Sequence, residues 1–478
     1  MDRTTIACLP ICLVLAPLFV TGQTTVTPTK VFDLAPYGTT SARSMALCGP
    51  AKDKLCYTTL TSFGAQGITS AVWSITDAGA PFKLFEGQLP MDIAATDGNV
   101  VYYRTGSGFT GSYDFMFGAT NLVQAAPPPP AAPLLVLQPT HVGSATAFDA
   151  KVVNGKLNCA MDLGSNSGIE LVSIPGTSGP KALVKDIDPG AASGIPDGGV
   201  NGTCLFGGKL YFNAKTAAAG FELWTTDGTE AGTQQFSNFT AAGLTDFRVT
   251  EMRSTASRVL LSAQNQPGNT ELWTCTAEPG SLVLLKEIDP SPTAGSQPGY
   301  LTMVGSNTYF AASNGTNGRE LWVTDGTTAG TRMVKDLRTG ANVSSDPHGL
   351  IAFKNQLYFF AKDNAGVVGL YRTDGTSAGT VLCHATNATN YVSSVTTTTG
   401  RLYYLSHGQS TVLYRTDGTS ANHQKVQPLM REIQPYPYKY GTFVARGKSL
   451  FFMADYGGSG TSLYTVVDPT FVPPVIKK

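Results

Sequence analysis

The sequence has no excess of charge of either sign. Its 478 residues carry 33 basic and 33 acidic side chains, and charged residues make up only 14% of the chain. Nucleic acids and anionic membranes attract concentrated positive charge, so the balanced composition argues against both as partners. Glycine and proline are frequent instead, with 52 and 29 copies, and 42% of the residues are apolar. Such a composition favours many short strands joined by turns over a helical fold.

Long hydrophobic runs are absent after residue 20, so the sequence predicts no transmembrane segment beyond that point. Residues 1–22, with Arg3 ahead of an apolar run from 6 to 20, resemble a secretory signal peptide; an uncleaved anchor is the alternative. The tail, residues 471–478, lacks the hydrophobic stretch of a lipid-anchor signal. We therefore expect a secreted protein, extracellular or associated with the cell surface, in which residues 23–470 form a single domain.

Cysteine is scarce. Two of the eight cysteines fall in the first 22 residues, and the remaining six are too few for a disulfide framework in so long a chain. Cys48 and Cys56 flank a predicted hairpin turn and could pair in an oxidising compartment. Cys159 could pair with Cys204. No CxxC pair or cluster of Cys and His indicates zinc, and we expect neither a metal nor a cofactor.

One phrase recurs along the chain. FELWTTDGTEAGT begins at Phe221, RELWVTDGTTAGT at Arg319, GLYRTDGTSAGT at Gly369 and VLYRTDGTSANH at Val412. Its aromatic position is occupied by Trp73, Trp224, Trp273, Trp322, Tyr371, Tyr414 and Tyr464, and its aspartate by Asp227, Asp325, Asp374 and Asp417. Over the four copies with leucines 223 to 370 the period is 49 residues. Repeats on this scale predict a solenoid, a propeller or an array.

Each repeat divides into four segments of strand length. The second is rich in aromatics, as in NTYFAAS from Asn307 and QLYFFAK from Gln356. The third holds ELW, and DGT makes the turn into a fourth, such as VKDID from Val184 or VKDLR from Val334. Asp can bond its own downstream amides and Gly tolerates positive φ, so turn chemistry explains DGT without a ligand. We expect Leu and Trp to pack inward while Thr and Glu face polar surroundings.

The segment from Glu320 to Thr331 resembles the ELWxxDGT repeat of secreted and surface proteins, many of them bacterial. Residues 222–233 match it fully as well, whereas 370–380 lacks the Glu and Trp and 413–421 loses the closing GT. The resemblance covers most of the chain after residue 22. It implies a repeat-built, propeller-like β domain of mostly unassigned activity. The turn is also similar to the Asp boxes of sialidase propellers, which are structural and distant from catalysis.

The third segment can be counted nine times, including degenerate copies near Phe115 and Leu171. We therefore predict an all-β propeller of nine four-stranded blades, with eight as the alternative. The ninth copy has no fourth segment after it, whereas 31–34 resembles the fourth segment 334–337. A ring closed by this N-terminal strand would leave no open sheet edge at the seam.

Propellers usually bind ligands through the loops that lead from the fourth strand of one blade to the first of the next. In these loops the sequence offers Asp197, Tyr300, Asp346, His348, Tyr436, Tyr438 and Tyr440 as candidate ligand-binding residues. Stacking faces beside hydrogen-bonding groups suit a glycan or a protein. We expect a non-enzymatic binding or scaffold module of the extracellular matrix or cell surface. The alternatives are loops that only brace strand entry, and a glycosidase or lyase acting on extracellular polysaccharide through Asp197, Asp346 or Glu251.

Five sequons agree with a glycosylated secreted protein: Asn201, Asn238, Asn314, Asn342 and Asn387.

Two other motif matches are interpreted as coincidences. Residues 106–111 fit GxGxxG, but no helix follows to receive a phosphate. Ser377 fits a hydrolase elbow, but it occupies a turn position of the repeat. Calcium at the DGT turns would need more oxygens than one Asp supplies.

Overall fold

The computed structural model describes residues 29–32, 39–48, 54–62, 68–75, 82–87, 91–97, 100–106, 115–121, 150–162, 168–175, 181–195, 202–239, 247–266, 268–291, 294–386, 391–407, 411–426, 443–454 and 462–467. Within these ranges the secondary structure consists of β-strands and one short 3₁₀ helix, η4 (Ser420–Asn422). The expectation of an all-β fold is confirmed for them. No helix among them is long and apolar enough to cross a membrane. The segments 1–22 and 471–478 lie outside the described residues.

The described strands form nine antiparallel sheets. The first four along the chain are β2 (Thr39–Cys48), β3 (Lys54–Ser62), β4 (Ile68–Ile75) and β5 (Phe82–Gly87); β6 (Met91–Asp97), β7 (Val100–Gly106) and β8 (Phe115–Asn121); β9 (Lys151–Val153), β10 (Lys156–Asp162), β11 (Ile169–Ile174) and β12 (Ala182–Lys185); and β13 (Cys204–Phe206), β14 (Lys209–Thr216), β15 (Gly220–Thr226) and β16 (Gln234–Gln235).

The other five are β17 (Arg248–Ser254), β18 (Val259–Gln266), β19 (Asn269–Cys275) and β20 (Val283–Lys286); β21 (Gly299–Val304), β22 (Asn307–Ser313), β23 (Arg319–Thr324) and β24 (Arg332–Lys335); β25 (His348–Phe353), β26 (Gln356–Lys362), β27 (Val368–Thr373) and β28 (Val381–Ala385); β29 (Tyr391–Thr397), β30 (Leu402–His407), β31 (Thr411–Thr416) and β32 (Gln424–Lys425); and β33 (Phe443–Arg446), β34 (Ser449–Ala454) and β35 (Ser462–Val467) with β1 (Thr29–Phe32).

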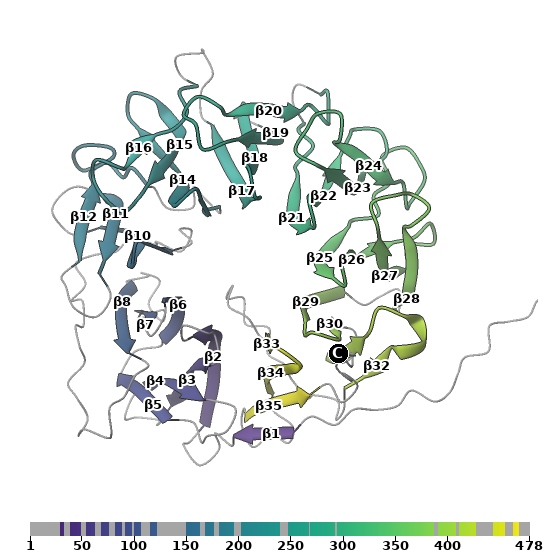
Figure 1. Cartoon of the computed structure of the whole chain (residues 1–478), viewed down its shortest axis with the longest axis horizontal. Helices are drawn as coiled ribbons and strands as arrows, with labels where there is room; N and C mark the ends of the chain where they lie inside the picture. Colours follow the sequence, from purple (N-terminus) through teal and green to yellow (C-terminus); the bar gives the residue numbers. More distant parts are fainter. Residues whose placement is uncertain are drawn as a thin grey trace, which may run out of the picture.

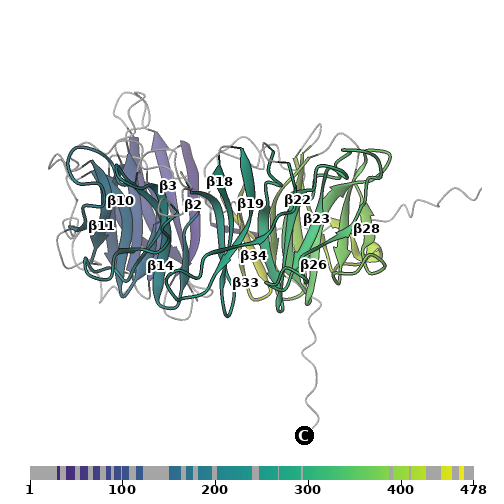
Figure 2. The ribbon, with the colours of Figure 1, turned by 90° about the horizontal axis from the view of Figure 1, so that it is seen from above.

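The sheets stand around a ring in chain order (Figure 1). Strands β17, β21 and β25 lie next to the central space, and β20, β24 and β28 lie at the outside. Seen from the side, the ring is a flat disc whose strands run across its thickness (Figure 2). Radially arranged antiparallel sheets of four strands make a β-propeller. The predicted β-propeller fold is therefore observed.

The N-terminal strand β1 lies in the same sheet as the last three strands of the chain. Lys30 pairs with Tyr464 of β35, and the register shifts between Lys30 and Phe32. At the equivalent position of the β21–β24 sheet, Met333 pairs with Trp322, and the register shifts beside this pair too. β1 thus holds the position of a fourth strand next to β35, which is the pairing that the sequence predicts.

The third strand of a sheet is buried on both faces, contrary to the expectation of one polar face. In β23, Leu321 belongs to a core shared with Phe359 of the following sheet. Its neighbour Trp322 belongs to a core shared with Leu260 of the preceding sheet, and Glu320 is fully buried as well. Successive side chains of a strand point to opposite faces. The expectation was wrong because, in a ring, each face of a sheet meets another sheet.

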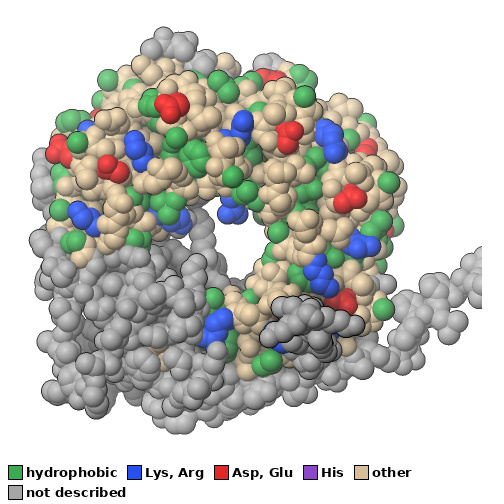
Figure 3. All heavy atoms as spheres, viewed as in Figure 1, with side chains coloured by type: hydrophobic (Ala, Val, Ile, Leu, Met, Phe, Trp, Pro, Cys, Tyr) green, Lys and Arg blue, Asp and Glu red, His purple; other side chains and the backbone are tan. Residues whose placement is uncertain are grey.

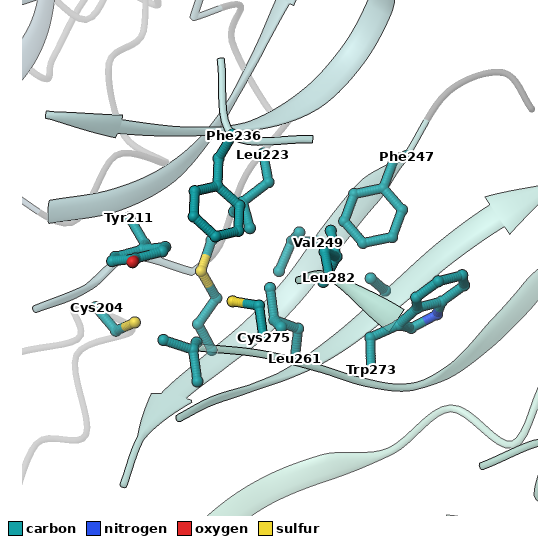
Figure 4. Packing of buried hydrophobic residues seen from close by; sticks show 13 residues of the cluster. Cys204, Tyr211, Leu223, Phe236, Phe247, Val249, Leu261, Trp273, Cys275 and Leu282 are labelled. Atoms are coloured by element: carbon teal, nitrogen blue, oxygen red, sulfur yellow. The ribbon is translucent and has the colours of Figure 1, made fainter. Parts of the chain in front are cut away.

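Figure 4 shows one of these cores between sheets. Tyr211, Leu223 and Phe236 lie on one side, and Phe247 and Trp273 of the following sheet lie on the other. The rings of Phe247 and Trp273 meet edge to face with centroids 5.3 Å apart, a favourable aromatic geometry. The predicted burial of the repeat tryptophans is confirmed where their side chains are described, at Trp224, Trp273 and Trp322.

Two degenerate copies of the repeat have a different register from the one expected. The hairpin pairing places Val172, rather than Leu171, at the position of the repeat aromatic. In the β6–β8 sheet this position is held by Gly118, three residues after Phe115. Neither Val172 nor Gly118 carries an aromatic ring, so spacing along the sequence could not locate the register of these two strands.

The DGT turns fold as their residue types predict. Asp325 Oδ1 accepts the backbone N–H of Thr327 at 2.8 Å and the Thr327 hydroxyl at 2.7 Å, and Gly326 has a φ of 88°. The same bonds form at Asp227, Asp374 and Asp417. The hydrogen bond from the Thr327 hydroxyl is the main reason why the pKa of Asp325 is lowered. No ligand is needed to explain these turns.

The DGT turns also join neighbouring sheets. Arg258, in the β17–β18 hairpin, donates from Nη1 to the carbonyl oxygen of Gly326 in the next sheet at 2.6 Å. Lys354, in the β25–β26 hairpin, donates from Nζ to the carbonyl oxygen of Asp417 at 2.9 Å. The end of the ring that carries the DGT turns is therefore cross-linked by hydrogen bonds, and the loops that lead into the first strands lie at the opposite end.

Candidate functional site

A buried glutamate from the third strand fixes the loop that leads to the next sheet. Glu320 accepts the N–H of Leu337 at 3.1 Å, and it accepts the N–H of Ser345 at 2.8 Å and its hydroxyl at 2.6 Å. Both ends of the loop are thereby bonded to β23. Equivalent bonds join Glu271 to Ile288, Asp289 and Ser296, and Glu170 to Ile187, Asp188 and Gly194.

The pKa values of these glutamates are raised above the ordinary value of a carboxyl group. Burial raises the pKa of Glu170 and of Glu320 to about 7, against the opposing effect of their hydrogen-bond donors. Burial also raises the pKa of Glu271. Because their oxygens are occupied by donors of their own loops, we assign them a positioning role. Sequence analysis missed this role, although Glu271 and Glu320 both stand before Leu-Trp, and Ser296 and Ser345 stand near the ends of the loops that follow.

The β25–β28 sheet, one of those that lack the glutamate, shows what the carboxylate does. Gly369 replaces it, and the outer strand β28 continues until Ala385 pairs with Gly369. In the β21–β24 sheet the outer strand ends earlier, at Lys335, because the N–H of Leu337 is donated to the glutamate. The fourth segments predicted as VKDID and VKDLR are too long for the same reason, and β12 ends at Lys185.

Tyr300, at the start of β21, combines an exposed ring with an unusual backbone. Its side chain is 52% exposed and its φ is 63°, a region that bulky residues seldom occupy. The equivalent residue of the next sheet is Gly349, with a φ of 60°. Glu251 of β17 holds this bend, because its two carboxylate oxygens accept the N–H of Tyr300 at 2.7 Å and of Leu301 at 2.8 Å. Strain fixed in this way is found at functional sites.

Arg319, the first residue of β23, lies at the same end of the ring. Its Nη1 donates to the carbonyl oxygen of Gln297 at 2.6 Å. A Cβ atom on Gly299 would come within 3.0 Å of its Nη2, so this glycine leaves room for the guanidinium group. Burial lowers the pKa of Arg319, and the charges of Glu251 and Asp346 oppose that shift. Arg319 is therefore a partly desolvated cation.

The structure brings together the three candidate residues that it describes, Tyr300, Asp346 and His348. The N–H of Asp346 donates to the carbonyl oxygen of Arg319 at 3.2 Å, and Asp346 Oδ2 pairs with Lys362 Nζ at 2.6 Å. Nδ1 of His348 lies 2.9 Å from the Asp346 carbonyl oxygen. The remaining candidates, Asp197, Tyr436, Tyr438 and Tyr440, lie outside the described residues.

Arg319 was missed by sequence analysis. It stands directly before the repeat glutamate, where other copies have Ile169, Phe221 or Thr270. A charged residue at a position that is otherwise apolar or small was the available signal. Figure 3 shows one end of the ring, open at its centre, with Lys and Arg side chains and acidic side chains interspersed over its described part.

Two of the three carboxylates considered for catalysis, Glu251 and Asp346, are described, and both are engaged in other contacts; Asp197 lies outside the described residues. Both oxygens of Glu251 accept backbone N–H groups, and Asp346 is paired with Lys362. Burial raises the pKa of Glu251, and backbone donors oppose this shift. In the described part of the chain no group of three His, Cys, Asp or Glu side chains is arranged to hold a metal ion.

The cysteines differ in part from the expectation. Cys159 and Cys204 are both free thiols, buried in different sheets, so the pairing considered between them does not occur. Burial raises the pKa of each of these thiols to about 12. Cys56 is disulfide-bonded. The side chain of Cys48 lies outside the described part of the molecule, and the Cys48–Cys56 bond stays a prediction.

Similarity to known proteins is confined to solved structures, since no protein-family model and no curated protein matches the chain. A prolyl endopeptidase aligns with a TM-score of 0.42 and 14% identity over 76% of this chain and 52% of its own, so this chain spans about half of it. BamB from Moraxella catarrhalis aligns with a TM-score of 0.40 and 12% identity over 80% and 96% of the two chains. The β-propeller domain of the trilobed protease from Pyrococcus furiosus aligns with a TM-score of 0.38 and 9% identity, over 82% and 98%. At these identities and TM-scores the alignments carry no conclusion about what this chain binds or does.

Proposed function

We propose that this chain is a secreted binding or scaffold module, without catalytic activity or cofactor, that recognises a glycan or a protein through the loops at one end of the ring. The observation that carries the proposal is Tyr300. Its aromatic ring is exposed, and Glu251 holds its backbone in a conformation with positive φ, for which the next sheet has a glycine, Gly349. An aromatic face is a common anchor for sugars and for protein side chains.

We also propose that the chain is a member of the ELWxxDGT repeat proteins and a closed ring of nine blades. The support for closure is the register of β1, which pairs with β35 as an outer strand pairs elsewhere. Closure of a propeller protects the sheet edges at its seam. Among the described residues, eight sheets have four strands and the β6–β8 sheet has three.

Secretion and glycosylation belong to the same proposal. Of the sequons, Asn238 and Asn342 are exposed, which suits a glycan acceptor. Asn314 is less accessible, and its side chain closes its own turn by accepting the N–H groups of Thr316 and Asn317. Asn201 and Asn387 lie outside the described residues. Expressed in a eukaryotic secretory host, the protein should lose mass on glycosidase treatment; unchanged mass would remove this part of the proposal.

The binding function is tested with the purified full-length protein on a glycan array and in a pull-down from extracellular matrix. We expect retention of a defined glycan or matrix protein, without turnover, and weaker retention by the Tyr300→Gly variant. A protein that retains neither class of ligand would contradict the proposal. Cleavage of a retained sugar would contradict the non-enzymatic assignment.

A further inference from the structure

We propose that Tyr300 and Arg319 together bind an acidic saccharide, one whose sugar ring carries a carboxylate. This inference rests on the proposed binding function and specifies its ligand. Arg319 takes the carboxylate, and the Tyr300 ring packs against the face of the sugar. The site lies at the end of the ring opposite the DGT turns.

The first support is that Arg319 forms no direct ion pair among the described residues. Its guanidinium group uses one donor, on the Gln297 carbonyl oxygen. The nearest acidic groups are committed elsewhere, since Glu251 accepts two backbone N–H groups and Asp346 pairs with Lys362. A partly buried cation that no carboxylate contacts directly is less favourable than a paired one, and a bound carboxylate would supply that direct pair.

The second support is the shape of the donor set. A guanidinium group presents its N–H donors as a planar fork that matches a carboxylate in a two-bonded arrangement. Gly299 has no side chain to cover Nη2, which a Cβ at that position would approach to 3.0 Å. A lysine could supply the charge of Arg319 but not this fork.

The third support is the preorganisation of Tyr300. Its N–H and that of Leu301 are both held by Glu251, so the backbone that carries the exposed ring is already fixed before a ligand binds. A preorganised platform loses little entropy on binding. The aromatic ring offers an apolar face to the C–H groups of a sugar, while its hydroxyl stays at the rim.

The charge around the site also favours an anion. The site has three positive charges and two negative ones. The cations are Arg253, Arg319 and Lys362, and the carboxylates are Glu251 and Asp346. Arg253 is exposed, and its Nε donates to the carbonyl oxygen of Leu301 at 3.0 Å. One additional carboxylate would bring the cluster to neutrality.

The test is calorimetric titration of the full-length protein with a uronic-acid oligosaccharide, and with the same oligosaccharide after reduction of its carboxyl groups to alcohols. We expect binding of the acidic form and an affinity at least about tenfold lower for the reduced form, as for loss of a charged hydrogen-bonded pair. Equal affinity for the two forms would overturn the inference.

Variants assign the binding to this site. Arg319→Ala should weaken binding of the acidic oligosaccharide at least about tenfold, and Arg319→Lys should recover only part of the loss. Tyr300→Gly restores the residue type of the neighbouring copy, so it should keep or raise the melting temperature while it weakens binding. Lys156→Ala, an exposed cation at the opposite end of the ring, should leave affinity unchanged.

The outcomes separate the ligand from the general function. Wild-type affinity in both Arg319→Ala and Tyr300→Gly would overturn the inference even if the acidic oligosaccharide binds. Retention of a neutral glycan or a defined matrix protein, without any binding of the acidic oligosaccharide, would overturn the inference and leave the proposed function standing. A protein that binds none of these would overturn both.

Discussion

The aromatic residue of the third strand shows how far a single side chain can be read from the sequence. Its burial follows from its place beside leucine in a strand repeat, and the structure confirms it at Trp224, Trp273 and Trp322. What sequence could not predict is that the leucine and the aromatic face different sheets. The indole nitrogens of the same three residues have no acceptor among the described residues, so these tryptophans stabilise the ring through apolar contact.

Replacement of Trp322 tests this description. We expect Trp322→Ala to lower the free energy of unfolding by about 3 to 5 kcal/mol, because it opens a cavity between the β17–β20 and β21–β24 sheets. Trp322→Phe keeps most of the volume and removes the unpaired N–H, so it should cost less than about 1.5 kcal/mol. Chemical denaturation measures both. Similar losses in the two variants would show that the indole nitrogen, and not the apolar ring, is what matters.

Glu320 predicts a particular dependence of stability on pH. Its pKa is raised from the ordinary value of 4.5 to about 7 in the folded protein. Between pH 4.5 and pH 7, therefore, the folded state keeps a proton that the unfolded state has released. The stability that this group contributes is fully present below about pH 4.5 and is lost as the pH rises through about 7. The contribution of Glu320 to the melting temperature should therefore decrease between pH 5 and pH 8.

Glu320→Gln removes this titration. The stability of the variant should improve relative to the wild type as the pH rises from 5 to 8. The exposed residue Glu278 provides a control, and Glu278→Gln should leave the pH profile unchanged. Parallel profiles for Glu320→Gln and the wild type would contradict the assignment. The DGT aspartates could be assigned from residue chemistry alone, whereas the role of Glu320 depends on donors that reach it from a loop 17 to 25 residues away.

At the scale of elements, inner strands were more predictable than outer ones. The segments NTYFAAS and QLYFFAK coincide with β22 and β26, because each has strand-forming residues between clear turn residues. The fourth strands are shorter than expected, since the glutamate carboxylate competes for their backbone donors. That competition joins distant parts of the chain, and no local pattern reveals it.

Gly375 of a DGT turn and Gly155 of the β9–β10 turn make a matched pair for substitution, because both have a positive φ. Gly375 has a φ of 92°, and a Cβ atom there would lie 2.7 Å from the hydroxyl of Tyr309 in the preceding sheet. Gly155 has a φ of 72°, and a Cβ atom there would have no neighbouring atom within 4 Å. Gly155→Ala should therefore cost about 1 kcal/mol from the backbone alone, and Gly375→Ala should cost more.

Tyr309→Phe separates the backbone strain at position 375 from the contact with the Tyr309 hydroxyl. Introduced together with Gly375→Ala, it should recover part of the loss, because the hydroxyl that the new methyl group meets is removed. Equal unfolding free energies for Gly375→Ala and Gly155→Ala would show that contact between sheets plays no part in the glycine requirement. Denaturant titration of the single and double variants measures the coupling.

For the whole molecule, the pairing of the chain's first described strand with its last was predictable because residues 31–34 share a pattern with 334–337. Proposed ring closure makes a further prediction. Deletion of residues 1–34 should lower the melting temperature of the entire protein, because β35 loses its outer partner. A peptide with the sequence of residues 27–36 should raise it again. An unchanged melt after deletion would show that the seam does not hold the ring together.

The glutamate-bound loops have a consequence for changing what the protein binds. Glu170, Glu271 and Glu320 each fasten a loop at its entry and its exit to the same strand. Between those two anchor points, we expect the exposed residues that do not bond to a strand to tolerate replacement without altering the spacing of the sheets. Libraries restricted to residues 189–192, 290–294 or 339–342, which leave out Ser193, Gly295 and Ser344, should therefore yield new specificities on an unchanged scaffold.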